Sequence, residues 1–164
     1  MSIDFDDKVP VSLTSIATRP LFVMRLAVKP IVIVGQTPGA FRRIGIVPGG
    51  TVSGHRVNGV VLDGSSDWQS VRADGSTTLD VRLVIRTHDD ALITMVYRGV
   101  RHGPSDVIAR LERGELVEPT GYYFRIAPVF ETSSPTYDWL NRVMGIGSGH
   151  RTADGPIYSV FEVL

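Results

Sequence analysis

Carboxylates and arginines alternate with apolar residues along segments of this sequence that have the character of β-strands. In residues 77–87, Asp80 and Arg82 stand two positions apart, which places both side chains on one face of a strand, about 6–7 Å apart along it. Leucine, valine and isoleucine form the other face. A positioned carboxylate can move a proton, and a neighbouring guanidinium can bind an oxyanion or a carboxylate. The pair therefore has the composition of a small acid–base site.

The same arrangement recurs in the two strand-like segments that follow. Their less apolar faces carry further candidate side chains, namely Arg98, Tyr123, Arg125 and Glu131. If these faces line one barrel, the arginines need anions, which Asp80, Glu131 or an anionic ligand can supply. Two other interpretations are open. The charges can face solvent, which is usual for such alternation, or they can form an internal salt-bridge network with a structural role alone.

A third candidate lies at Asp67 and Trp68, where a loop passes into a strand. A carboxylate against an aromatic wall can have a raised pKa, which suits acid–base catalysis near neutral pH, although a tryptophan at such a position is more often a core residue that plugs the barrel end. Further aromatic residues can stack on a ligand. We assign catalysis to Asp67, Asp80 and Glu131, and substrate binding to Trp68, Arg82, Arg98, Tyr123, Arg125, Tyr137 and Trp139.

Several other kinds of site are not supported by the sequence. There is no cysteine, and the four histidines lack a spacing such as His-x-x-x-His, so we expect no metal site. The glycine-rich residues 48–54 lack the Lys-Ser/Thr end of a P-loop, and no Gly-x-Ser-x-Gly elbow is present. We therefore expect a protein that works without a cofactor.

Charge and hydropathy narrow the class of partner. Lys+Arg and Asp+Glu balance at 17 each, so there is no basic surplus for nucleic acid. No apolar run approaches the roughly 20 residues of a membrane span, and the acidic N-terminus lacks the features of a signal peptide. We expect a cytoplasmic protein that binds neither nucleic acid nor membranes.

Short strands must position these side chains. The 164 residues suit one domain, and apolar runs separated by glycine and proline predict an all-β, antiparallel β-barrel of about eight to ten strands. Two short helices are predicted, over residues 105–113 and 137–144, each ended by a glycine. We expect residues 1–12 to be a flexible lead-in and residues 13–164 to form the single barrel domain.

A series of short motifs follows in a characteristic order. They are Gly49-Gly50, Gly59, Gly64, Asp67-Trp68, Asp74-Gly75, Asp80-x-Arg82, Thr87, Tyr123-Phe124-Arg125, Phe130-Glu131-Thr132 and Tyr137-x-Trp139-Leu140-Asn141. In this order the sequence resembles domain-of-unknown-function family 3237, from about residue 14 to the C-terminus. The resemblance implies a small antiparallel barrel that often forms a dimer or higher oligomer, and it implies little about activity. The sequence departs from the family at the turn His88-Asp89-Asp90, where Asp-Gly is expected. Barrels of similar architecture hold small organic molecules and include cyclases and isomerases, which is an analogy of fold alone.

Three functions fit these observations. The first is a cofactor-independent isomerase, cyclase or lyase, in which an arginine binds the substrate and one carboxylate moves a proton. The second is a binding protein for a small anionic or aromatic ligand, without catalysis. The third is a structural role, in which the apolar face of residues 77–87 joins copies of the chain. We favour the first, and expect a small organic ligand and a homo-oligomer.

Overall fold

Eleven β-strands dominate residues 8–164, the part of the chain that the structure, a computed structural model, describes. The strands are β1 (Thr18–Ala27), β2 (Val32–Gln36), β3 (Phe41–Val47), β4 (Gly49–Ser53), β5 (Gly59–Val61), β6 (Ser65–Val71), β7 (Thr77–Thr87), β8 (Leu92–His102), β9 (Tyr123–Glu131), β10 (Gly145–Thr152) and β11 (Gly155–Val163). The helices are α1 (Ser105–Glu112) and the short 3-10 helices η1 (Val11–Leu13), η2 (Pro119–Gly121) and η3 (Pro135–Arg142). Of the expected lead-in, residues 1–7 lie outside the described residues.

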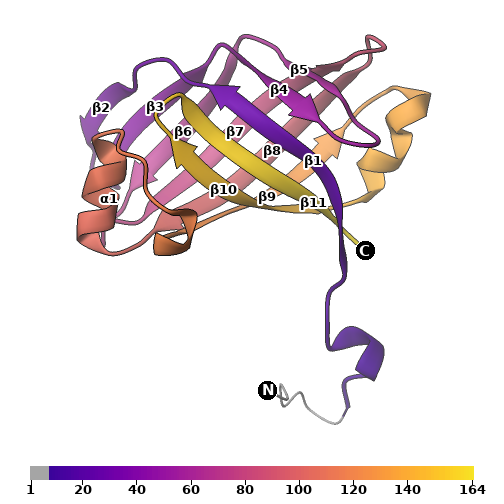
Figure 1. The fold of residues 1–164 in the computed structure, drawn as a ribbon, viewed down its shortest axis with the longest axis horizontal. Helices are drawn as coiled ribbons and strands as arrows, with labels where there is room; N and C mark the ends of the chain where they lie inside the picture. The colour runs from indigo at the N-terminus through magenta and orange to yellow at the C-terminus, as the bar shows by residue number, and fades with distance from the viewer. Residues whose placement is uncertain (1–7) are drawn as a thin grey trace.

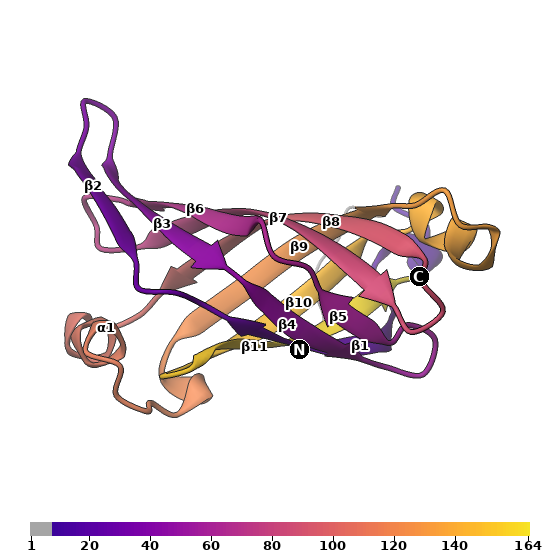
Figure 2. The same ribbon diagram turned by 90° about the horizontal axis from the view of Figure 1, so that it is seen from above.

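Eight of these strands close into an antiparallel barrel, which confirms the predicted fold class. The ring runs β7-β5-β4-β1-β11-β10-β9-β8 and returns to β7 through the β7–β8 pairing (Figure 1). Closure leaves no free edge within the ring. The other three strands, β6, β3 and β2, continue the sheet from β7, and we call them the extension. β7 belongs to both the ring and the extension, because its residues 77–82 pair with β6 and its residues 85–87 pair with β5. The extension and α1 lie at the same end of the barrel (Figure 2).

The inward face of β7 is apolar. Its side chains are at most 3% exposed, and they are Leu79, Val81, Leu83 and Ile85. Asp80 and Arg82 lie on the outer face, so the interpretation in which these charges face solvent is confirmed and the one in which they line the lumen is wrong. The physical reason is that burying the apolar row stabilises the barrel by about 25 cal/mol per Å², whereas burying the charges costs free energy. The same burial excludes the apolar row as a contact between copies of the chain.

Strand β10 was not expected from the sequence, because glycine occupies three of its alternate positions. These inward positions face β9, and a Cβ atom on Gly149 would lie 2.5 Å from Cδ1 of Phe124. The missing side chain therefore lets the Phe124 ring lie against the β10 backbone. This contact places Phe124 in the wall of the cavity described below.

The two predicted helices are present in altered form. α1 covers nearly the predicted range, but Pro104 and not Ser105 precedes its first residue. The second segment forms the 3-10 helix η3, which buries Tyr137 and Leu140 and ends at Arg142, before the predicted end. Within residues 8–164, no helix has both the length and the apolar character that crossing a membrane requires.

Candidate functional site

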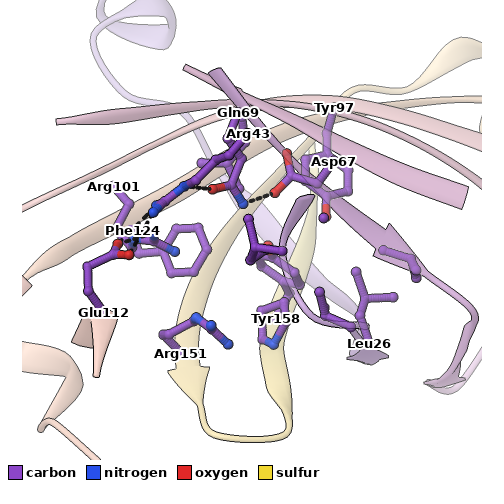
Figure 3. Close-up of a pocket in the computed structure, with 16 residues that line it drawn as sticks. Leu26, Arg43, Asp67, Gln69, Tyr97, Arg101, Glu112, Phe124, Arg151 and Tyr158 are labelled. Atoms are coloured by element: carbon purple, nitrogen blue, oxygen red, sulfur yellow. Dashed lines mark hydrogen bonds and ion pairs between the residues drawn. The ribbon is translucent and has the colours of Figure 1, made fainter. Parts of the chain in front are cut away.

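A cavity opens at the end of the barrel that carries α1 (Figure 3). Its empty volume is about 550 Å³ including the open mouth, and the centres of water molecules fit over about 50 Å³ of it. Two or more water molecules or a small chemical group can occupy such a space. The wall combines apolar side chains from β1, β3 and β7 with a set of polar residues, namely Arg43, Asp67, Gln69, Tyr97, Arg101, Glu112, Arg151 and Tyr158.

Asp67 is the buried one of the two acidic residues in the described part of the chain that line this cavity, and Glu112 is the other. It lies in β6, between two tight turns whose glycines, Gly64 and Gly75, have φ values of 92° and 82° that side chains disfavour. Its Oδ2 accepts a hydrogen bond of 2.6 Å from Nε2 of Gln69. Its Oδ1 is shielded from solvent and has no hydrogen-bond partner within residues 8–164.

The environment of Asp67 changes its acidity. Burial raises the pKa of its carboxyl group from 3.8 to about 6, although the hydrogen bond from Gln69, the charges of Arg101 and Arg43 and the nearby backbone amide of Asp80 act in the opposite direction. That amide does not reach hydrogen-bond geometry with Oδ1 of Asp67. Because this pKa is near neutral, the group can both accept and release a proton at physiological pH. Asp67 therefore has the acidity that a general acid–base catalyst requires.

Aromatic rings form the wall next to Asp67. Tyr97 and Tyr158 are each 1% exposed, and their ring centroids are 5.7 Å apart. Phe124 meets Tyr158 edge-on, with 5.4 Å between centroids. Burial raises the pKa of both phenol groups above the ordinary value of 10, and the negative charge of Asp67 adds to the effect. Both hydroxyls therefore stay protonated near neutral pH and remain able to donate hydrogen bonds.

Arginines and one glutamate surround the mouth. Arg43 donates two hydrogen bonds to the carboxylate of Glu112, at 2.6 and 2.9 Å, and Nη2 of Arg101 lies 3.4 Å from the same carboxylate. Nε of Arg43 also donates to Oε1 of Gln69 at 2.7 Å. Since Gln69 donates in turn to Asp67, a chain of hydrogen bonds runs from Glu112 at the mouth to the buried acid (Figure 3).

Charge and burial also shift the acidity of the groups at the mouth. Burial acts to raise the pKa of Glu112, but the hydrogen bond and charge of Arg43 outweigh it and hold that pKa below its usual value. Burial lowers the pKa of Arg101, yet a guanidinium keeps its proton in proteins. Glu112 is therefore a carboxylate and Arg101 a cation at neutral pH.

Five of the predicted site residues lie around an open groove on the outer surface instead. They are Trp68, Asp80, Arg98, Tyr123 and Arg125. Within this groove Nη2 of Arg98 lies 3.5 Å from Oδ2 of Asp80, and the guanidinium of Arg125 lies 5.0 Å from the Tyr123 ring centroid.

The predicted internal charge cluster is therefore wrong in its location. Arg82 and Glu131 are also exposed, and Glu131 lines a separate hollow beside Thr94. The whole cluster, Asp80, Arg82, Arg98, Arg125 and Glu131, lies on the outer face, where water solvates the charges that burial would leave costly.

The two predicted aromatic residues of η3 lie apart from both the cavity and the groove. The Tyr137 hydroxyl donates to Oδ1 of Asp89 at 2.8 Å. Trp139 packs under the guanidinium of Arg56, 3.9 Å from the ring centroid, and Arg56 pairs with the buried Glu162. Both contacts attach η3 to the barrel. Of the ten predicted site residues, Asp67 alone lies in the cavity wall.

The sequence contained one signal for part of the cavity wall. Asp67 and Gln69 stand two positions apart in a strand, so they share a face, and Trp68 between them must face the other way. The remaining cavity residues come from strands far apart in the chain. Nothing in their local sequence distinguishes Arg43, Arg101 or Arg151 from the arginines of the outer surface.

Comparison with known proteins places the chain in a family. The sequence model of DUF3237, a family of proteins of unknown function, matches residues 16–163. A UPF0311 protein from Rhodopseudomonas palustris is 33% identical over 150 residues, which cover 92% of this chain and 98% of that protein.

Two crystal structures share the fold. A conserved protein of unknown function from Rhodopseudomonas palustris has a TM-score of 0.89, with 33% identity and coverage of 92% of this chain and 99% of that one. A β-barrel-like protein from Acinetobacter baumannii has a TM-score of 0.81, with 34% identity and coverage of 94% and 100%.

A more distant relative has a named activity. A hydroalkoxylation enzyme from Penicillium herquei is 27% identical over 144 residues, which cover 84% of this chain and 81% of that protein. The match of the family model over most of the barrel and the 33% identity to the UPF0311 protein agree with the resemblance found in the sequence. The chain belongs to the DUF3237 family.

Proposed function

We propose that this protein is a cofactor-independent acid–base catalyst that converts a small organic molecule in the barrel cavity, with Asp67 as the group that moves the proton. The observation that carries the proposal is the buried Oδ1 atom of Asp67, which has no hydrogen-bond partner within residues 8–164. An unpaired buried oxygen costs free energy. A substrate group that donates a hydrogen to this atom removes the cost, so the position favours binding of a proton donor.

The reaction class is isomerisation, cyclisation or elimination. The Asp67 carboxylate takes a proton from a C–H or O–H bond of the substrate, and the resulting carboxylic acid returns it to another atom of the molecule. An isomerisation or cyclisation of this kind conserves the atoms of the substrate and needs no oxidant. Tyr97 and Tyr158 can donate hydrogen bonds to a substrate oxygen that becomes negative during the reaction.

The fungal relative supports this reaction class. Hydroalkoxylation is the addition of an O–H bond across a carbon–carbon double bond, and the relative is named as an enzyme of that type. When both groups belong to one molecule, the C–O bond closes a ring, the hydroxyl loses its proton and a carbon gains one. A single carboxyl group that is active near neutral pH can assist both proton transfers.

The direct test measures proton transfer without requiring the natural substrate. A panel of small alkenols, including 2-allylphenol, and small ketones is incubated with the protein in D₂O. NMR detects deuterium that enters a carbon position, and chromatography detects cyclic isomers. We expect the wild type to accelerate exchange or cyclisation for one class, and Asp67→Asn to reduce the rate about 100-fold or more.

The matched control is Asp80→Asn, because Asp80 lies outside the cavity on the neighbouring strand. That variant should keep the wild-type rate. Full activity of a folded Asp67→Asn variant contradicts the proposal, as does a panel on which the wild type accelerates neither reaction.

A binding protein without catalysis is the second candidate. Arg101 is 5% exposed, and its guanidinium carbon lies 5.5 Å from the centroid of the Phe124 ring, which suits a ligand that is both anionic and aromatic. A ligand that is recovered unchanged after long incubation with the wild type, and that binds Asp67→Asn equally well, favours this candidate over the catalyst.

A further inference from the structure

We propose that Arg43, Arg101 and Arg151 form a subsite for the carboxylate of a small organic acid, and that the Glu112 carboxylate holds this subsite until the acid binds. This inference rests on the proposed function and names its substrate class. The subsite lies at the mouth of the cavity, on the side of α1, and Asp67 lies farther along the same wall (Figure 3).

Positive charge exceeds negative charge around the three arginines. Arg101 is 5% exposed, and its contact with Glu112 at 3.4 Å is long. Arg43, with 11% of its side chain exposed, takes both oxygens of Glu112. Arg151 donates to the carbonyl of Thr152 and forms no ion pair with any carboxylate of residues 8–164.

Three cations therefore lie near two carboxylates, Glu112 and the more deeply buried Asp67, and one positive charge is left in excess. All three arginines line the same cavity, and the charges of Arg43 and Arg151 both repel that of Arg101. Buried charges are stable when they are paired, and like charges in a poorly solvated site are not. An incoming anion offsets the excess, and a neutral ligand does not.

Glu112 lies where an incoming anion can displace its side chain. It is the last residue of α1, a helix that buries Leu111 alone, and its side chain is 42% exposed. The carboxyl end of a helix disfavours a negative charge, so the arginines, and not the helix, hold the Glu112 carboxylate in place. A rotation of this side chain into solvent frees the guanidiniums without breaking any strand pairing.

The geometry of the Arg43 guanidinium favours a carboxylate as the anion. The fork of Arg43 already fits a carboxylate, with its two nitrogens on the two oxygens of Glu112. The interior of the cavity, in which the centres of water molecules fit over about 50 Å³, favours a small molecule. We therefore infer a small carboxylic acid as the substrate, and inorganic phosphate as the competing probe.

Gln69 connects the subsite to Asp67, the proposed catalytic residue. Arg43 and Asp67 bind opposite ends of the Gln69 amide, at 2.7 and 2.6 Å. A carboxylate held by the two Nη atoms of Arg43 is thus separated from Asp67 by the Arg43 guanidinium and the Gln69 amide. An acid bound in this orientation directs its reacting carbon or oxygen toward Asp67.

Calorimetric titration of the full chain tests the subsite without any turnover. The probes are benzoate, its uncharged analogue benzamide, and inorganic phosphate. We expect benzoate to bind at least tenfold more tightly than benzamide, and more tightly than phosphate. Arg151→Met and Arg101→Met should each weaken benzoate at least tenfold, and circular dichroism establishes that each variant is folded. Arg125→Met, on the outer surface, is the matched control and should leave the affinity unchanged.

The variant Glu112→Gln tests whether the Glu112 carboxylate is displaced by the ligand or has a structural role. It removes the competing charge while it keeps the shape, so benzoate should bind several-fold more tightly. Weaker binding in this variant overturns the proposal, as do equal affinities for benzoate and benzamide, or phosphate binding that is tenfold tighter than benzoate binding.

The same experiment distinguishes this subsite from the catalytic role of Asp67. Asp67→Asn removes a negative charge near Arg43 and Arg101, so it should bind benzoate at least as tightly as the wild type even where it loses turnover. If the arginine variants bind benzoate normally, the subsite is wrong and the catalytic proposal stands. If Asp67→Asn keeps its turnover, the catalytic proposal is wrong and the benzoate result is unaffected.

Discussion

Replacing Asp67 by asparagine should stabilise the protein more at pH 8 than at pH 5. The Asp67 carboxyl group has a pKa of about 6 in the folded protein against 3.8 for the ordinary value. A raised pKa means that the unfolded chain ionises first, so the group destabilises the fold at a pH above both values. Below both values the carboxyl group is protonated in either state and this contribution disappears.

The magnitude follows from the two pKa values. At pH 8 the destabilisation is about 3 kcal/mol, and at pH 5, where ionisation of the folded state is suppressed, it is about 1.6 kcal/mol. Asparagine removes the titration and adds an effect on hydrogen bonding that does not vary with pH. The stability difference between variant and wild type should therefore grow by about 1.4 kcal/mol from pH 5 to pH 8.

Urea unfolding at constant ionic strength, followed at pH 5, 6, 7 and 8, measures this difference. The control is Asp80→Asn, whose exposed side chain pairs with Arg98 in solvent and should give a difference that is nearly constant over the range. A constant difference for Asp67→Asn, or one that grows toward acid pH, refutes the reasoning that this carboxyl group is strained by burial.

Other consequences of the cavity are open to measurement. The kcat/KM of the wild type should rise through about pH 6, because Asp67 must be ionised to accept the first proton, and a profile flat from pH 5 to 8 contradicts that role. Gly45→Ala places a Cβ atom in ordinary contact, 3.6 Å from Cβ of Asp67, so thermal stability should hold while activity falls at least tenfold through lost space. Gly149→Ala forces a Cβ atom to within 2.5 Å of Phe124 and should lower the unfolding free energy by about 1–3 kcal/mol, measured in urea. Equal stability of these two alanine variants contradicts the packing described for β10.

Alternation along β7 predicted the strand itself but left open which face turns inward. The apolar row of β7 and its polar row obey the same period of two, and only closure of the ring decides between them. A barrel of eight strands is narrow enough to be filled by side chains, so the apolar row becomes the core. The interpretation with a charged interior identified the strands correctly but assigned the wrong face of them to the interior of the barrel.

The cavity itself depends on pairings that the local sequence does not reveal. Arg43 meets Gln69 because β3 and β6 pair in one particular register. Arg101 and Arg151 come from strands of the ring that lie far from Arg43 in the chain. The sequence predicts a role for Asp67 because an aromatic residue follows it in the strand, yet Trp68 is 55% exposed and lies on the opposite face.

The sharing of β7 between ring and extension divides the cavity wall into two independently built parts. Asp67, Gln69 and Arg43 are carried by β6 and β3, which take no part in closing the barrel, whereas Tyr97, Arg101 and Tyr158 belong to strands that do. Substitutions that tilt or lengthen the extension can thus change the gap between the acid and the aromatic wall while the ring keeps the protein folded. In this architecture, substrate preference can diverge on one part while stability is maintained by the other.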